Sequence, residues 1–177
     1  DYAQVQKELS TTQDVSFATR KKLAGKVFNL TSAYDAAISN FLLGEDEFPH
    51  YLNISYQKSA DLRYGENPHQ KAAFYTATTQ AGVLKDFVQL HGKELSFNNI
   101  RDMDLAWKVV AEFNEVAACG VKHSTPCGVA IGANVADAYA KMHASDPVSI
   151  FGGIVAINSE VDLATAKEMN NTFLEIV

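Results

Sequence analysis

The stretch EVAACGVKH, residues 115–123, decides the fold, because its apolar run predicts a strand buried inside a sheet. A helix is predicted before it in SFNNIRDMDLAWKVVAEF (96–113), with Ser96 as its N-cap. Another helix is predicted after it in ANVADAYAKMHASD (133–146), and then a strand in SIFGGIVAIN (149–158). Helices that alternate with strands indicate an α/β layer whose sheet is at least partly parallel.

The same alternation extends to both sides of this region. KAAFYTAT (71–78) and DFVQLHG (86–92) predict strands, and DLATAKEMNNTFLEIV (162–177) predicts a helix that leads into the start of a strand. We therefore expect the sheet to be incomplete within this chain. Residues 45–61, which are acidic at first and contain Pro49, predict a linker or surface loop.

The N-terminal part of the chain predicts helices alone. Residues 1–9 have a short helical pattern, and a long amphipathic helix follows, which Asp14 or Ser16 can cap and Gly44 can end. Its apolar stripe consists of residues at helical spacing, namely Leu23, Val27, Leu30, Tyr34, Ala37, Ile38 and Phe41.

Composition limits the class of protein. The 177 residues are 47% hydrophobic and 20% charged, which allows a sizeable core. A net charge of -6 argues against nucleic acid or an acidic membrane as the main partner. No stretch is apolar over the length that spans a bilayer, and no signal peptide is visible at a start that lacks Met, as in a chain that begins inside a longer protein. Two cysteines without a CxxC pattern indicate a reducing compartment and no disulfide framework.

Lys122 and His123 stand where the buried strand ends, which is where ligands bind in many α/β sheets. A Lys there can stabilise developing negative charge, and a neutral His can accept a proton. The following TPCG (125–128) suits the N-terminus of a helix, whose N–H groups would face a ligand. Taken alone, a Lys and a His at the end of a strand more often point into solvent than take part in catalysis.

Two further motifs bear on the kind of site. The Pro-Cys pair at residues 126–127 is similar to part of the zinc-deaminase signature, but no second Cys follows and no H-x-E occurs, so the sequence argues against a zinc site. The stretch RYGENPHQ (63–70) contains the turn formers Gly65 and Pro68 and is rich in polar side chains, which indicates a loop. Its polar groups either bind a ligand or stabilise the turn itself.

Four segments in this order carry a resemblance to a known family: LRYGENPHQKAAFY, LSFNNIRDMDLAWKVV, VKHSTPCGVAIG and DPVSIFGGIVAIN. Together they resemble the bifunctional purine biosynthesis family that joins AICAR transformylase to IMP cyclohydrolase, over essentially the whole chain. The resemblance implies that residues 1–45 are the helical end of the cyclohydrolase domain, 46–61 a linker, and 62–177 the first part of the transformylase domain. It also implies a cytidine-deaminase-like three-layer α/β/α half-domain with a mixed sheet.

The resemblance implies a reaction as well. The family moves a formyl group from 10-formyltetrahydrofolate to the amine of AICAR and then closes the ring to IMP. Lys122 and His123 match its catalytic pair, with His123 as the base for the amine and Lys122 as the cation at the forming oxyanion. Thr125 precedes Pro126 where many bacterial members have Asn.

Five positions match substrate-contacting residues of the family: Arg63, Tyr64, Asn99, Gly152 and Glu175. A planar guanidinium suits the phosphate of AICAR, so Arg63 is the expected phosphate ligand. The residues after them, Asn67, Pro68, His69 and Gln70, are expected to hold the turn and take no chemical role.

The family also sets the expected surroundings. Its cyclohydrolase catalytic residues lie before the position of Asp1, and further folate contacts lie after Val177. A cytoplasmic homodimer that binds AICAR and folate is expected, with no metal, nucleic acid or membrane. Two other interpretations stay open: a relative of zinc nucleoside deaminases, and a nucleotide-binding or interaction module without catalysis.

Overall fold

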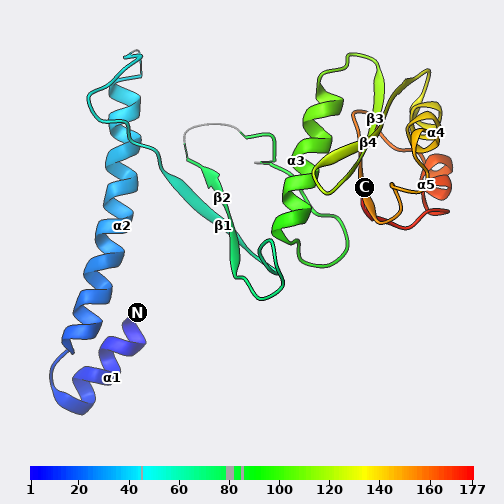
Figure 1. The fold of residues 1–177 in the computed structure, drawn as a ribbon. Helices are drawn as coiled ribbons and strands as arrows, with labels where there is room; N and C mark the ends of the chain where they lie inside the picture. Colours follow the sequence, from blue (N-terminus) through cyan, green and yellow to red (C-terminus); the bar gives the residue numbers. More distant parts are fainter. Residues whose placement is uncertain (45, 79–81, 85) are drawn as a thin grey trace. The chain divides into compact units, whose positions relative to one another are not determined.

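The computed structural model describes residues 1–44, 46–78, 82–84 and 86–177 of the chain. These residues form two compact units, the first from residues 1–57 and 76–78, the second from residues 58–75 and the described chain after residue 81. Within them lie five helices and six strands (Figure 1). No helix in the described part of the chain has both the length and the apolar character that crossing a membrane requires.

The first unit contains the helices α1 (Tyr2–Thr12) and α2 (Phe17–Leu42), as the sequence predicts. Ser16 caps α2, and its side chain accepts a hydrogen bond from the Thr19 N–H at 3.2 Å. The carboxylate of Glu8 on α1 accepts bonds from the Ser16 N–H at 2.8 Å and the Thr19 hydroxyl at 2.6 Å. These contacts join the two helices at their turn.

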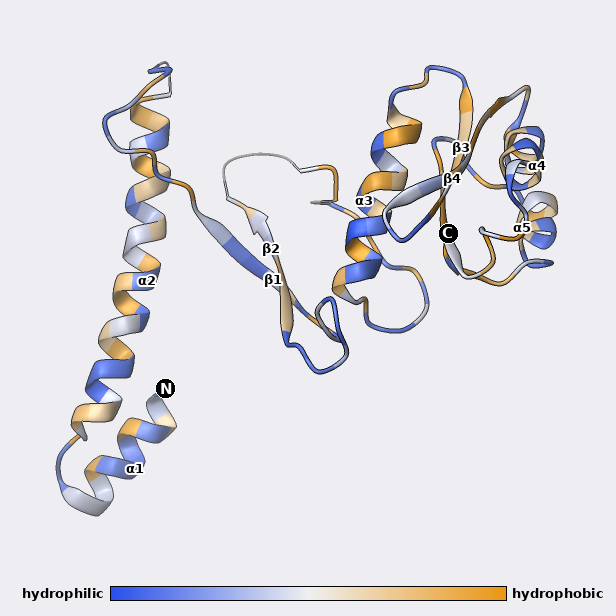
Figure 2. Ribbon diagram, viewed as in Figure 1, coloured by the Kyte–Doolittle hydropathy of each residue, from blue (hydrophilic) through white to orange (hydrophobic). Residues whose placement is uncertain are grey.

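The predicted apolar stripe of α2 lies on the surface of its unit. Leu30, Tyr34 and Phe41 of this stripe are 73%, 67% and 85% exposed, while Ala36, which is not part of it, is buried. Figure 2 shows hydrophobic residues recurring between polar ones along the whole helix. Exposed apolar side chains in such number are typical of a surface that packs against another part of a protein.

The second unit is built on a four-stranded sheet with the order β4-β3-β5-β6. Its strands are β3 (Val116–Lys122), β4 (Thr125–Gly132), β5 (Gly153–Ile157) and β6 (Leu174–Ile176). β3 pairs antiparallel with both β4 and β5, and β5 pairs parallel with β6, so the predicted mixed sheet is confirmed. Two further strands, β1 (Tyr56–Leu62) and β2 (Ala72–Ala77), form a separate two-stranded sheet.

Helices cover both faces of the four-stranded sheet. On one face, Ala106 and Val110 of α3 (Phe97–Ala111) pack on Ala117, Cys119 and Val121. On the other face, α4 (Val135–Ser145) and α5 (Leu163–Met169) pack on the sheet through a second core cluster, whose buried members are Ala118, Ala138, Tyr139, Met142, Ile150, Val155 and Met169. The unit therefore has a helix layer, a sheet and a second helix layer.

Small residues let α4 lie close to the sheet. A Cβ atom at Gly128 of β4 would collide with the carbonyl group of Met142, which belongs to the backbone of α4. A Cβ atom at Gly120 of β3 would meet the side chains of Ile150 and Met142. Glycine therefore stands where the strand backbone leaves no room for a side chain between the sheet and α4.

Three local predictions are wrong. TPCG does not start a helix but begins β4, which forms a hairpin with β3. Residues 86–92 contain no strand, and no described strand pairs with them. The assignment of residues 45–61 to a surface loop is wrong for its last part, because the stretch contains all of β1 except Leu62; the polar side chains of this strand lie mostly exposed and gave no alternation that would predict a strand.

Asn158 joins the end of β5 to the loop between α3 and β3. Its amide Nδ2 donates to the carbonyl oxygens of Val110, Phe113 and Glu115 at 2.9–3.2 Å, and its Oδ1 accepts from the Ala117 N–H at 2.8 Å. One side chain thus satisfies backbone groups that the helix end and the strand start leave unpaired.

Asn158→Ala should lower the free energy of unfolding by about 2–3 kcal/mol, because each lost hydrogen bond costs about 1 kcal/mol and the N–H of the fully buried Ala117 loses its acceptor. Urea unfolding followed by circular dichroism measures this. Asn171→Ala is the control, since that exposed side chain makes a single bond to Glu168 at 3.2 Å. Equal destabilisation by the two variants would contradict this role for Asn158.

Candidate functional site

Arg63 and Tyr64 follow directly after β1 and are tied to the segment before α3. The Arg63 N–H donates to the Leu95 carbonyl at 2.9 Å, and the Phe97 N–H donates to the Tyr64 carbonyl at 3.1 Å. The guanidinium of Arg63 lies 4.9 Å from the centre of the Tyr64 ring and donates to its hydroxyl at 3.3 Å. The tyrosine therefore supports the guanidinium through stacking and a hydrogen bond.

The loop after this pair is held by its own residues. The Gly65 N–H donates to the Gln70 carbonyl at 2.9 Å, and the Gln70 N–H donates to the Asn67 carbonyl at 3.0 Å. The Gln70 side chain also accepts from the Asn67 N–H at 2.8 Å. Asn67 and Gln70 hold the turn, as the sequence predicts.

The start of α3 lies beside this loop. Ser96 and Asn99 form a reciprocal cap: Asn99 Oδ1 accepts from the Ser96 N–H at 2.9 Å, and Ser96 Oγ accepts from the Asn99 N–H at 3.3 Å. The Asn98 side chain donates to the Glu66 carbonyl at 3.1 Å. The predicted N-cap at Ser96 is confirmed, and the cap fixes the position of Asn99.

A cavity of about 530 Å³ brings three of the predicted substrate residues together. Arg63, Asn99 and Glu175 all line it, although they come from the end of β1, the start of α3 and β6. The rest of its wall is formed by Phe87, Val88, Gln89, Leu90, His91, Gly92, Lys93, Glu94, Leu95, Met103, Phe173, Ile176 and Val177. Such a hollow, with a few convergent polar groups, is typical of a small-molecule site.

His91 and Lys93 also line the cavity but were not predicted as site residues, since residues 86–92 were expected to form a strand and Lys93 directly follows them. The chain turns there instead: Gly92 has a φ of 99°, and the Gln89 side chain donates to the carbonyls of His91 and Lys93 at 3.0 and 2.8 Å. A His-Gly-Lys sequence is itself a signal for a turn with two basic side chains. Together with Arg63, these residues add basic side chains to a wall that also contains Glu94 and Glu175.

Lys122 and Gly152 form a second group of contacts. The Lys122 ammonium donates to the Phe151 carbonyl and lies 3.9 Å from the position that a Cβ atom would take on Gly152. Gly152 has a φ of 69°, which favours glycine, and its N–H donates to the Phe173 carbonyl at 2.7 Å. Phe173 also lines the cavity of Arg63, so the two groups share this residue.

His123 and Ser124 form the two-residue turn between β3 and β4. Lys122 pairs with Thr125 across it, and the turn residues have φ values of 52° and 58°. Ser124 donates from both its N–H and its hydroxyl to one carboxylate oxygen of Asp102, each at 2.9 Å. His123 is exposed at the tip of this turn.

The predicted site residues are thus brought together in part. Arg63, Asn99 and Glu175 share one cavity, and Tyr64 contacts Arg63. Lys122, His123 and Gly152 do not line that cavity, although Lys122 and Gly152 lie together and Gly152 bonds to the lining residue Phe173.

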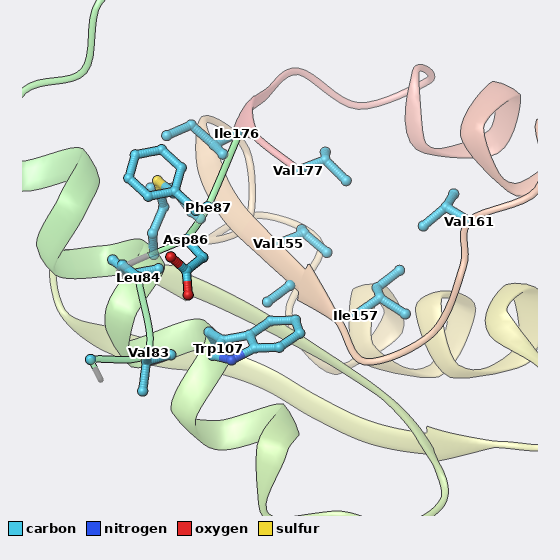
Figure 3. Close-up of a pocket in the computed structure, with 14 residues that line it drawn as sticks. Val83, Leu84, Asp86, Phe87, Trp107, Val155, Ile157, Val161, Ile176 and Val177 are labelled. Carbon is cyan, nitrogen blue, oxygen red and sulfur yellow. The ribbon is translucent and has the colours of Figure 1, made fainter. Parts of the chain in front are cut away.

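A more apolar cavity of about 450 Å³ lies next to the first and shares Phe87, Met103, Ile176 and Val177 with it (Figure 3). Trp107 of α3 and the strand residues Val155 and Ile157 form part of its wall, and Asp86 adds a carboxylate. No residue that the sequence predicts for substrate binding lines this cavity.

The two cysteines are held as neutral thiols. Burial raises the pKa of Cys119 to about 11, and burial also raises the pKa of Cys127, whose thiol donates to the Gly120 carbonyl at 3.4 Å. A protonated thiol is a poor nucleophile and a poor metal ligand. Among the residues that the structure describes, no group of three or more His, Cys, Asp or Glu side chains gathers as metal ligands would.

Comparison with known proteins gives a consistent result. The model of a family described as "AICARFT/IMPCHase bienzyme" matches residues 1–177. The bifunctional purine biosynthesis protein PurH of Fusobacterium nucleatum is 67% identical over 177 residues, which is 100% of this chain and 35% of that protein. PurH of Clostridium botulinum strain Hall is 62% identical over the same length, and PurH of Clostridium perfringens strain SM101 is 61% identical over 178 residues.

The chain spans about a third of the length of these relatives, 35% of the first. The family match nevertheless covers every residue of the chain, from Asp1 to Val177. With 61–67% identity in three bacterial species and a family match over its whole length, the chain belongs to the AICARFT/IMPCHase bienzyme family.

Proposed function

We propose that the chain is part of a bifunctional enzyme of purine synthesis and carries a share of the site that transfers a formyl group from 10-formyltetrahydrofolate to AICAR. The observation that carries this proposal is the cavity lined by Arg63, Asn99 and Glu175. Three residues from distant parts of the sequence, each matched to the nucleotide site of the family, line one hollow of suitable size.

Arg63 is proposed to hold the phosphate of AICAR. Its guanidinium is a planar fork that can donate two parallel hydrogen bonds to phosphate oxygens. Tyr64 keeps it in place by stacking at 4.9 Å, and Lys93 adds positive charge to the same cavity. A dianionic phosphate would be stabilised by the charges of Arg63 and Lys93, even though the chain as a whole has a net charge of -6.

Lys122 and His123 are proposed as the catalytic pair. The amine nitrogen of AICAR attacks the formyl carbon, His123 takes the proton that this nitrogen loses, and Lys122 stabilises the negative charge on the formyl oxygen. The formyl C=O bond then re-forms, the bond between the formyl carbon and the folate nitrogen breaks, and the leaving nitrogen receives the proton that His123 holds. Gly152 suits this chemistry, because the absence of a side chain there leaves the Lys122 ammonium uncovered.

The remaining parts of the proposal concern the longer protein. Ring closure to IMP is assigned to residues before Asp1, and further folate contacts are assigned to residues after Val177. Residues 1–45 would close the cyclohydrolase domain, 46–61 would link it, and 62–177 would begin a transformylase domain with a cytidine-deaminase-like fold. The whole enzyme is proposed to be a cytoplasmic homodimer that needs no metal and binds neither nucleic acid nor membrane.

In the full-length protein, His123→Ala should lower the rate of formyl transfer by ~10²–10⁴-fold, because a general base contributes about that much. Ring closure by the same sample should be unchanged. Both reactions are measured by the absorbance of their products.

His50→Ala is the matched control, because His50 is an exposed histidine of the first unit. It should leave both reactions at the wild-type rate. Formyl transfer by His123→Ala within threefold of wild type would show that another group is the base.

Arg63→Ala should raise the KM for AICAR about 10–100-fold, since a hydrogen bond to a charged group contributes about 1.5–3 kcal/mol. Arg63→Lys should restore only part of the affinity, because an ammonium cannot make the forked contact. The KM for the folate should stay the same. Arg20→Ala is the control, as Arg20 pairs with Asp14 on the surface of the first unit. An unchanged KM for AICAR in Arg63→Ala would assign the phosphate to other residues.

A further inference from the structure

The turn that carries His123 is unfavourable by itself. His123 and Ser124 both have φ near +55° (52° and 58°), a region where two consecutive residues with side chains are uncommon. Two-residue hairpin turns of this kind favour Asn-Gly or Gly-Gly, and each other residue costs about 1–2 kcal/mol. A turn with His-Ser must therefore be stabilised by contacts outside it.

Asp102 provides those contacts. One of its carboxylate oxygens accepts both the backbone N–H and the hydroxyl of Ser124, each at 2.9 Å. Two bonds to a single residue fix its backbone and its side chain together. Because Ser124 directly follows His123, the peptide plane that joins them is fixed as well.

Asp102 itself is held firmly. It is only 9% exposed, and it belongs to the second turn of α3. Among the ion pairs of the described residues, none involves Asp102, so its hydrogen-bonding capacity is directed at the turn. A buried carboxylate is costly unless hydrogen bonds compensate for lost water, and Ser124 supplies two.

The helix that carries Asp102 also adjoins the nucleotide cavity. Asn99, three residues earlier on α3, lines that cavity, and the Phe97 N–H bonds to the Tyr64 carbonyl. One rigid helix end therefore contacts both the Arg63–Tyr64 segment and the His123 turn.

We propose that Asp102 is a positioning residue for formyl transfer: through Ser124 it holds the backbone of His123 in the conformation that presents the imidazole to the amine. This inference rests on the proposed function. Asp102 touches no reacting atom in it, and acts through the geometry of the turn.

The test measures kcat and KM of formyl transfer in the full-length enzyme. Asp102→Ala should lower kcat about 10–100-fold, because a displacement of about 1 Å of a catalytic group costs about 10²-fold. The KM for AICAR should stay within threefold, since Arg63 and Asn99 are untouched. Asp104→Ala is the matched control, as Asp104 lies on the same helix and pairs with Lys108 at 2.6 Å on the surface.

A second substitution that restores kcat in Asp102→Ala distinguishes a positioning role of Asp102 from a direct chemical role. Glycine adopts positive φ at no steric cost, so Ser124→Gly should make the turn less dependent on Asp102, because only His123 then keeps an unfavourable φ. Ser124→Gly alone should keep kcat within threefold of wild type. In the Asp102→Ala background it should raise kcat at least fivefold.

The shape-conserving variant Asp102→Asn covers the case in which Asp102→Ala does not fold. A neutral oxygen is a weaker acceptor than a carboxylate, so its kcat should fall about three- to tenfold. The proposal is overturned if Asp102→Ala folds and its kcat is within twofold of wild type. It is also overturned if Ser124→Gly does not recover the kcat that Asp102→Ala loses. If Asp102→Ala does not fold, a wild-type kcat in Asp102→Asn overturns it. If His123→Ala is also fully active, the proposed function has failed instead, which is a separate result.

Discussion

The structure of the second unit depends on the burial of β3 on both of its faces. Every residue from Ala117 to Val121 is buried, so the strand contributes alternate side chains to two different cores. This constraint requires small residues on the α4 side, where Ala118 and Gly120 stand. Both the position of the helices and the point at which Lys122 leaves the sheet follow from it.

The helix α3 connects the two groups of residues that the proposed chemistry needs. Its N-terminal cap lies beside Tyr64, its next turn carries Asp102, and its buried side packs on β3 through Ala106 and Val110. The distance between the cavity of Arg63 and the turn of His123 is therefore set by one short, capped piece of helix. A helix is a rigid spacer, and precise placement is more reliable on such an element than on loops.

Much of this architecture can be predicted from the sequence. The period of apolar residues and Ser96 predicted α3, and the apolar run after residue 115 predicted β3. Prediction failed where one residue type fits two structures. Pro126 suits the start of a helix, but it is equally tolerated in β4, which lies at one edge of the sheet and, among the described strands, pairs with β3 alone.

The candidate site was predictable only in part, for a related reason. The resemblance to the family pointed to Arg63 and Asn99, which share a cavity. Asp102 gave no signal, because a carboxylate in an amphipathic helix normally faces water, and its hydrogen bonds to Ser124 join residues 22 positions apart. Such long-range pairs depend on tertiary packing, which local patterns do not encode.

The two-residue turn between β3 and β4 has a consequence for how this protein can vary. In a strand buried on both faces, inserting or deleting one residue would exchange the side chains that meet α3 for those that meet α4. Bulky Val121 would then occupy the place of Gly120, against Met142 and Ile150. Substitutions at the end of β3 are therefore tolerated more easily than an insertion or deletion within the strand. The length of this hairpin should be its most invariant property, more so than the identity of any residue between Val116 and Gly132.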